Sequence, residues 1–166
     1  MEARDLSRER AQPFQISLRI RHPSIDPGII SRELRLEAEY SFKAGDPRES
    51  GSGMAATALH SESYWLGSLG SITSSLSGFS GARTNVARER LQSGTIESLT
   101  LALDALVVGF MRTHSEFIRR MQSEEGQVCL LVELSTRALS GFALSPQFSR
   151  TISDLGVAVE FDFVMS

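Results

Sequence analysis

The sequence predicts a single α+β domain built on a mostly antiparallel sheet with helices on one face. Apolar and polar residues alternate in several short segments, and apolar residues recur at steps of three and four in others. The chain has 166 residues, of which 41% are hydrophobic and 22% charged, as expected for one globular domain. We expect residues 14–166 to form this domain and residues 1–13 to form a flexible arm.

The first third of the domain reads as strand, helix, strand. Residues 14–20 alternate strictly between apolar and polar side chains, which predicts a strand buried on one face only. Asp26 and Pro27 supply an N-cap and a proline at the first helical position, so a short helix follows. Residues 38–43 alternate again and predict a second strand. Its core side is expected to carry Ala38, Tyr40 and Phe42.

The middle of the chain contains one strand, two long loops and a long helix. Residues 63–69 predict the third strand, between loops at about 46–62 and 70–94 that are rich in Gly and Ser. From Thr95 to the glycine at position 126, apolar residues recur at steps of three and four. This spacing predicts one continuous amphipathic helix of about seven turns.

The C-terminal part repeats the organisation of the N-terminal part. Residues 128–134 predict a strand, Ser145 and Pro146 open a helix, and residues 157–164 predict the last strand. Aligned on their prolines, the two helix-strand pairs match in apolar pattern without a gap. The sequence thus predicts two pseudo-repeated βαβ units in one sheet, with a ferredoxin-like β-α-β-β-α-β core and an extra helix and strand.

Most of residues 14–164 are spanned by short motifs in the order found in a known bacterial family: ISLRI at 16–20, DPGII at 26–30, KAGD at 43–46, Trp65, a helix in the middle of the chain, and LGV at 155–157. In these motifs the chain resembles the family catalogued as domain of unknown function 4279. The resemblance implies no activity, because none is established that could be carried over to these residues.

Charge and composition exclude several classes of function. The chain has 17 Lys and Arg against 20 Asp and Glu, giving a net charge of −3, so it offers no overall field for nucleic acid or an anionic membrane. Its longest apolar stretch, 101–111, is interrupted by Asp104 and is too short to span a bilayer. With one cysteine and no apolar leader at its start, we expect a cytoplasmic protein.

No pattern of catalytic or metal-binding residues stands out. His22, His60 and His114 lie far apart in the sequence, and no spacing typical of a zinc site is present. Cys129 lies on a predicted strand without a neighbouring cation in the sequence, so we interpret it as a structural thiol. We therefore predict no metal and no cofactor, and an enzyme is the least favoured class.

The uncovered face of the sheet remains as the candidate binding surface. It could be a solvated face with weak cross-strand ion pairs, or a platform that recognises a partner with an aromatic anchor. The first hypothesis is a non-catalytic protein-interaction module, by analogy a toxin-immunity protein; the second is a sensor of a small polar ligand, and a homodimer is compatible with either. The residues assigned to this face are Arg19, Arg21, Glu39, Trp65, Glu133 and Glu160.

Overall fold

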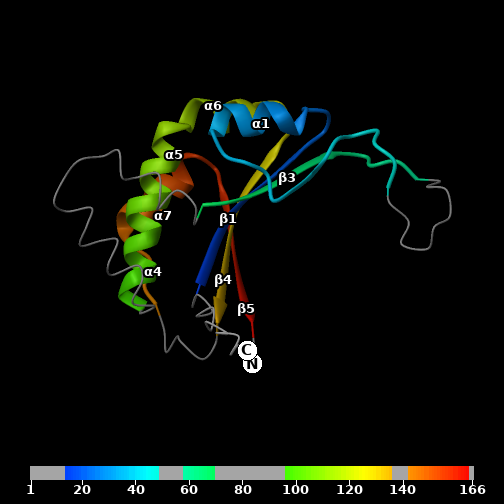
Figure 1. Ribbon diagram of the computed structural model, residues 1–166. Coiled ribbons are helices and arrows are strands. Elements are labelled where there is room, and N and C mark those ends of the chain that lie inside the picture. Colours follow the sequence, from blue (N-terminus) through cyan, green and yellow to red (C-terminus); the bar gives the residue numbers. More distant parts are fainter. Residues whose placement is uncertain (1–13, 49–57, 70–95, 136–141, 165–166) are drawn as a thin grey trace, which may run out of the picture.

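The computed structural model describes residues 14–48, 58–69, 96–135 and 142–164. Figure 1 shows their arrangement, with the helices gathered along one side and the top of a twisted sheet. The predicted arm at residues 1–13 and the predicted loop at 70–94 lie outside the described residues, as does the central part of the loop at 46–62.

The sheet has five strands in the order β2-β3-β1-β4-β5. All neighbouring pairs are antiparallel except β4 and β5, which are parallel. The α+β class and the mostly antiparallel sheet are thus confirmed. The parallel pair at one end makes the order differ from that of a wholly antiparallel ferredoxin-like sheet. The strands are β1 (Phe14–His22), β2 (Tyr40–Phe42), β3 (Ser63–Ser68), β4 (Gln127–Ser135) and β5 (Ala158–Val164).

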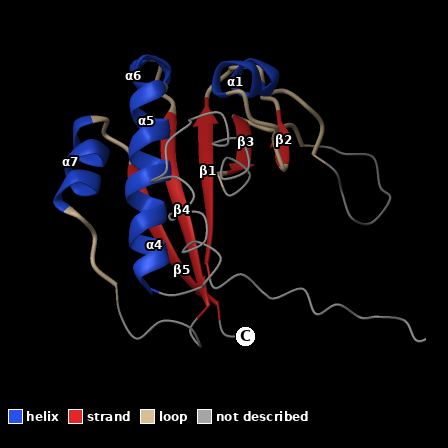
Figure 2. Ribbon diagram, turned by 60° about the vertical axis from the view of Figure 1, so that its left-hand side comes forward, coloured by secondary structure: helices blue, strands red, loops and turns tan. Residues whose placement is uncertain are grey.

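The described helices lie on one face of this sheet, as Figure 2 shows. Their buried residues meet the apolar side of the strands in a single core, which includes Ile16, Leu18 and Ile20 of β1. None of the described helices is long and apolar enough to cross a membrane. The helices are α1 (Pro27–Leu34), α4 (Ile96–Ala102), the π-helical turn η2 (Leu103–Val108), α5 (Gly109–Thr113), α6 (Ser115–Ser123) and α7 (Pro146–Asp154).

The long central helix is not continuous, contrary to the sequence prediction. Residues 103–108 form a π-helical turn, where the Asp104 carboxylate accepts a hydrogen bond from the Ser145 hydroxyl at the start of α7. At His114 the backbone leaves helical geometry, with φ −106° and ψ 19°, and the chain bends between α5 and α6. The bend brings α6 beside α1, where Arg120 and Glu33 form an ion pair at 3.3 Å.

Both proline-led helices begin where the sequence predicts. Gly28 N donates to the Asp26 carboxylate at 2.8 Å, and Phe148 N donates to the Ser145 hydroxyl at 3.0 Å, so each cap satisfies a free helical N–H. The two units differ in their strands, however. In the C-terminal unit the two parallel strands, β4 and β5, are direct neighbours. In the N-terminal unit the two parallel strands, β1 and β2, are separated by β3.

The turn from β1 to α1 is held by a buried histidine. The His22 side chain is 6% exposed, and its Nδ1 accepts hydrogen bonds from Ser24 N at 3.1 Å and Ile25 N at 3.0 Å. Nδ1 is therefore an acceptor, which places the proton of the neutral imidazole on Nε2. Nε2 lies 3.3 Å from a carboxylate oxygen of Glu124, in the turn between α6 and β4.

His114, at the bend between α5 and α6, gives stability a pH dependence. Burial and the nearby Arg35 lower its pKa from the usual value of 6.5. Protonation therefore favours the unfolded chain. Its contribution to the free energy of unfolding should be complete above pH 6.5 and should decline as pH falls from 6.5 towards the lower folded-state pKa.

Chemical unfolding at a series of pH values down to about 5.5 measures this effect. In the His114→Gln variant the pH-dependent loss of stability should be smaller than in the parent chain, because the substituted side chain does not titrate. The carboxylates Asp26 and Glu160, whose pKa values are lowered, lose their contribution only at more acidic pH. Parallel curves for the two proteins would contradict the prediction.

Candidate functional site

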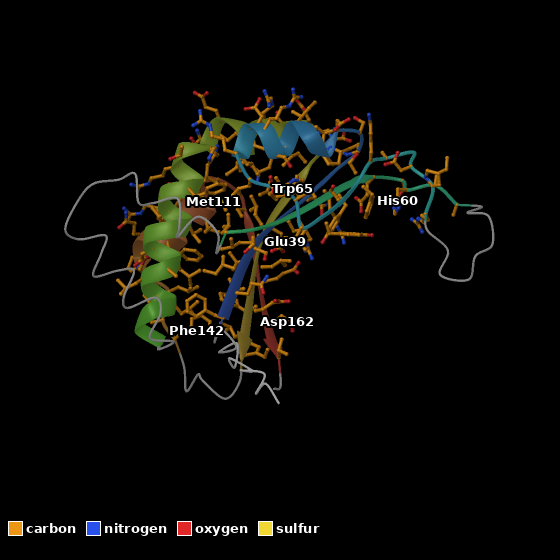
Figure 3. The ribbon with its side chains drawn as sticks, viewed as in Figure 1. Glu39, His60, Trp65, Met111, Phe142 and Asp162 are labelled. Carbon is orange, nitrogen blue, oxygen red and sulfur yellow. The ribbon has the colours of Figure 1, made fainter. Side chains whose placement is uncertain are left out.

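We call the side of the sheet opposite the helices the open face. Because side chains alternate along each strand, the register of the sheet determines which residues share it. In Figure 3, Asp162 lies on this side, whereas Met111 and Phe142 lie on the helix side. The open face carries Tyr40 and Phe42 of β2, Tyr64 and Leu66 of β3, Arg19 and Arg21 of β1, Cys129, Leu131 and Glu133 of β4, and Glu160 and Asp162 of β5.

An ion pair crosses the centre of the open face. Arg19 Nη2 donates to the Glu160 carboxylate over the intervening strand β4, where Cys129 stands opposite Arg19. The Arg19 side chain is 21% exposed and that of Glu160 54%, so solvent screens the pair only partly. The hydrogen bond from Arg19 lowers the pKa of Glu160. Burial raises the pKa of the Cys129 thiol, which therefore stays protonated and is a poor nucleophile.

One end of the open face is aromatic. The Phe42 ring stacks on His60 at 3.7 Å between centroids and on Tyr64 at 5.3 Å, and Tyr40 contacts both Phe42 and Tyr64 edge-on at 5.8 Å. We call these four residues the aromatic cluster. Tyr40 is 59% exposed, so part of the cluster is available for contact. Tyr64 faces Arg21 in the neighbouring strand, which places a cation beside the cluster.

The other end of the open face is acidic. Glu133 of β4 and Asp162 of β5 occupy facing positions, and both are exposed. No Lys, Arg or His of the described residues lies within ion-pair distance of either carboxylate. We call Glu133 and Asp162 the acidic pair. The open face thus grades from aromatic and cationic on β2, β3 and β1 to acidic on β4 and β5.

The acidic pair should cost stability. Like charges on facing strand positions repel, so Asp162→Lys should raise the free energy of unfolding by about 0.2–1 kcal/mol. Asp162→Asn removes the repulsion without adding an attraction and should fall between the parent chain and Asp162→Lys. Urea unfolding at low and high salt measures the difference, which should shrink as salt increases. A lower stability for Asp162→Lys would contradict the prediction.

No protein-family model, curated protein or solved structure matches the chain. The function is therefore inferred from the geometry of the open face.

Four of the six sequence-predicted site residues do lie on the open face: Arg19, Arg21, Glu133 and Glu160. The prediction was wrong for Trp65, which is fully buried on the helix side. Its Nε1 donates to Ser31 Oγ of α1 at 2.9 Å, and its position opposite Ile20 aligns it with the core residues of β1.

The expected orientation of the second strand was also wrong for Tyr40 and Phe42. Tyr40 stands opposite Leu66 and Phe42 opposite Tyr64, so both aromatic residues face away from the helices. Glu39 precedes β2 in a bend and is exposed, so the pairing of β2 with β3 does not assign its side chain to either face; Ala38 packs against the core, as expected. The three-residue strand is oriented by its pairing with β3, since its own burial is slight.

The aromatic cluster was missed by the sequence analysis, which assigned Tyr40 and Phe42 to the core and His60 to a loop. A signal was present: each of two neighbouring segments carries aromatic residues, YSF at 40–42 and YW at 64–65. Alternation alone did not reveal which of them face outwards. The aromatic side of residues 40–42 was assigned to the core although it faces outwards, and residues 64–66 carry large apolar side chains on both sides.

The histidines do not meet in space either. His22 holds the first turn, His60 stacks on Phe42, and His114 contacts Phe110 at 4.5 Å between ring centroids. Within the described residues, no group of three His, Cys, Asp or Glu side chains could hold a metal ion. At the open face the described residues present aromatic rings, guanidinium groups and carboxylates.

Proposed function

We propose that the chain is a protein-interaction module that binds a partner protein through the open face. The aromatic cluster beside Arg21 carries the proposal. Exposed Tyr and Arg side chains dominate the binding energy of protein interfaces, because each combines a large contact area with hydrogen-bonding groups. Tyr40 is 59% exposed, and Arg21 is only loosely paired, with Nε 3.8 Å from the Glu62 carboxylate.

The charge pattern gives the interface an orientation. A partner would place an apolar recess over Tyr40 and basic groups towards the acidic pair. The Arg19–Glu160 ion pair holds the centre of the face in one geometry, and binding of the partner does not have to break it. Complementary charge of this kind favours specificity and rapid association more than affinity.

A sensor of a small polar ligand is less well supported. That hypothesis expects Trp65 to line a pocket with converging Arg and Glu side chains. Trp65 is instead buried in the core, and its ring nitrogen is already hydrogen-bonded to Ser31. An exposed aromatic and ionic surface favours a macromolecular partner over an enclosed ligand.

We further propose that the chain is a divergent bacterial, cytoplasmic member of the family it resembles, with a ferredoxin-like core. The strand order supports a ferredoxin-like core. The connection from β1 to β2 passes over β3, and the connection from β3 to β4 passes over β1, so that β5 is a strand appended to this core. Toxin immunity is one role for such a module, and a toxin gene beside the gene for this chain would support it.

Site-specific photo-cross-linking in cells that naturally produce the chain tests the proposed function. A benzophenone amino acid at position 40 should give a discrete cross-linked product with a partner protein. The same amino acid at Arg150, exposed on α7, should give none. Arg21→Ala should weaken the Tyr40 product at least about tenfold if Arg21 is a main contact. Equal products from both positions, or no product from position 40, would refute the proposal.

A further inference from the structure

The outer edge of β5 is unpaired in the part of the chain that the structure describes. β5 pairs in parallel with β4 and with no other described strand, so one row of its backbone N–H and C=O groups has no strand partner. Figure 2 shows β5 at the end of the sheet. Proteins commonly protect such edges with lysine, proline or a bulge. The seven residues of β5, AVEFDFV, contain no lysine or proline, and their register with β4 is regular.

The apolar side of β5 extends beyond the core. Val159 and Phe161 pack partly against the core, and the Phe161 ring lies 5.0 Å from that of Phe142. Phe163, two residues further along the same side, is 57% exposed. An added strand could cover Phe163 with apolar side chains at alternate positions.

The opposite side of β5 presents charge of one sign. Asp162 and its neighbour Glu133 lack a cation among the described residues, whereas Glu160 is engaged by Arg19. A strand with Lys or Arg on this side would neutralise the acidic pair. Its basic residues would alternate with the apolar residues that cover Phe163, because successive side chains of a strand point to opposite faces.

We propose that the outer edge of β5 binds an extended segment of a partner protein in which apolar and basic residues alternate. The segment adds a sixth strand to the sheet; its backbone pairs with β5, its apolar side chains cover Phe163, and its basic side chains reach the acidic pair. This inference rests on the proposed function only in taking the partner to be a protein, since it uses the edge of the sheet and not the aromatic cluster.

A second copy of the chain fits this edge poorly. Antiparallel pairing of two β5 strands centred on Phe161 sets Glu160 against Asp162 of the other copy. Pairing centred on Asp162 sets the Asp162 carboxylates of the two copies against each other. Either register adds like charges to a strand that already carries an unbalanced pair.

Binding of a labelled peptide to the full chain tests the proposal. The probe is a fluorescein-labelled peptide of five Lys-Val repeats, followed by fluorescence anisotropy. A peptide of the same composition with its lysines in one block should bind at least about tenfold more weakly, because it cannot alternate. Amide hydrogen exchange in residues 158–164 should slow on binding, whereas exchange in the three residues of β2 should not change.

Backbone methylation separates strand pairing from simple charge attraction. One further probe is N-methylated on every lysine and another on every valine, so each loses the hydrogen-bonding N–H groups of one edge only. One of the two should lose at least about tenfold in affinity and the other should retain it. Equal affinity of the alternating and block peptides, or full retention by both methylated peptides, would overturn the proposal.

Variants of the chain locate the peptide. Asp162→Lys should weaken binding at least about tenfold, whereas Asp154→Lys, the same charge change on α7, should have less than about a twofold effect. Equal losses in both variants would show a dependence on net charge alone and reject the site. Concentration-dependent dimers of the parent chain that Asp162→Lys strengthens would favour a second copy instead and also overturn it.

Failure of the edge site is distinguishable from failure of the proposed function. Tyr40→Ala should leave peptide affinity unchanged, because the aromatic cluster lies on the far strands of the sheet. Cross-linking from position 40 without peptide binding would reject the edge site alone. Peptide binding without that cross-link would reject the open face alone.

Discussion

Replacing Trp65 with alanine is expected to lower the free energy of unfolding by about 3–5 kcal/mol. Trp65 is fully buried between α1 and the sheet, and its indole lies over Gly67, where an added Cβ would come within 2.4 Å of the ring. The substitution leaves a cavity in the middle of the core and removes the donor to Ser31 Oγ. Urea unfolding followed by circular dichroism measures the loss.

Trp65→Phe is the matched control. It keeps an aromatic ring in the core but removes the Nε1 donor, so its cost should be about 1–2 kcal/mol. Ser31→Ala should be nearly neutral in the Trp65→Phe background, because the hydrogen bond is already lost. If Trp65→Ala left stability unchanged, the indole would not be a core residue and the corrected assignment would be wrong.

His22→Ala is expected to lower the free energy of unfolding by about 2–4 kcal/mol. The substitution leaves Ser24 N and Ile25 N without their acceptor in the partly buried turn that leads into α1, and it also empties a buried site. Thermal and urea unfolding measure the change, and hydrogen exchange at the two amides reports the turn directly.

His22→Asn should recover more than half of that loss. The amide oxygen of asparagine takes nearly the same place as the imidazole Nδ1 and can accept from the same backbone groups. If His22→Asn and His22→Ala were equally destabilised, packing of the ring would outweigh the two hydrogen bonds. The turn would then be stabilised by packing of the His22 ring and not by the hydrogen bonds to its Nδ1.

Much of the fold follows from local patterns. Alternation predicted β1, β4 and β5 within one or two residues, and the N-caps Asp26 and Ser145 predicted the starts of α1 and α7. These signals are reliable because each depends only on residues that are close together in the sequence. The π-helical turn and the bend at His114 were not predictable in this way, since the apolar spacing of three and four runs through both of them. The hydrogen bond that the turn makes joins Asp104 to Ser145, 41 positions away.

The candidate site was predictable only in its central and acidic parts. Arg19, Glu133 and Glu160 belong to long strands, where the buried side determines the other side. Trp65 belongs to a segment with large apolar side chains on both sides, and Tyr40 to a short strand whose aromatic side faces outwards. Their orientation is set by register with neighbouring strands, which a single sequence does not specify.

The adjacency of β1 and β4 at the centre of the sheet has a consequence for biosynthesis. The two strands pair over nearly their whole length, yet they are more than a hundred residues apart in the chain. On the ribosome β1 therefore emerges long before β4, and of its two strand partners only β3 is available in the meantime. β4 and β5, by contrast, are separated by only 22 residues in the sequence. Completion of the sheet must wait for the C-terminal part of the chain, and a nascent chain stalled before residue 127 would leave one edge of β1 without its strand partner.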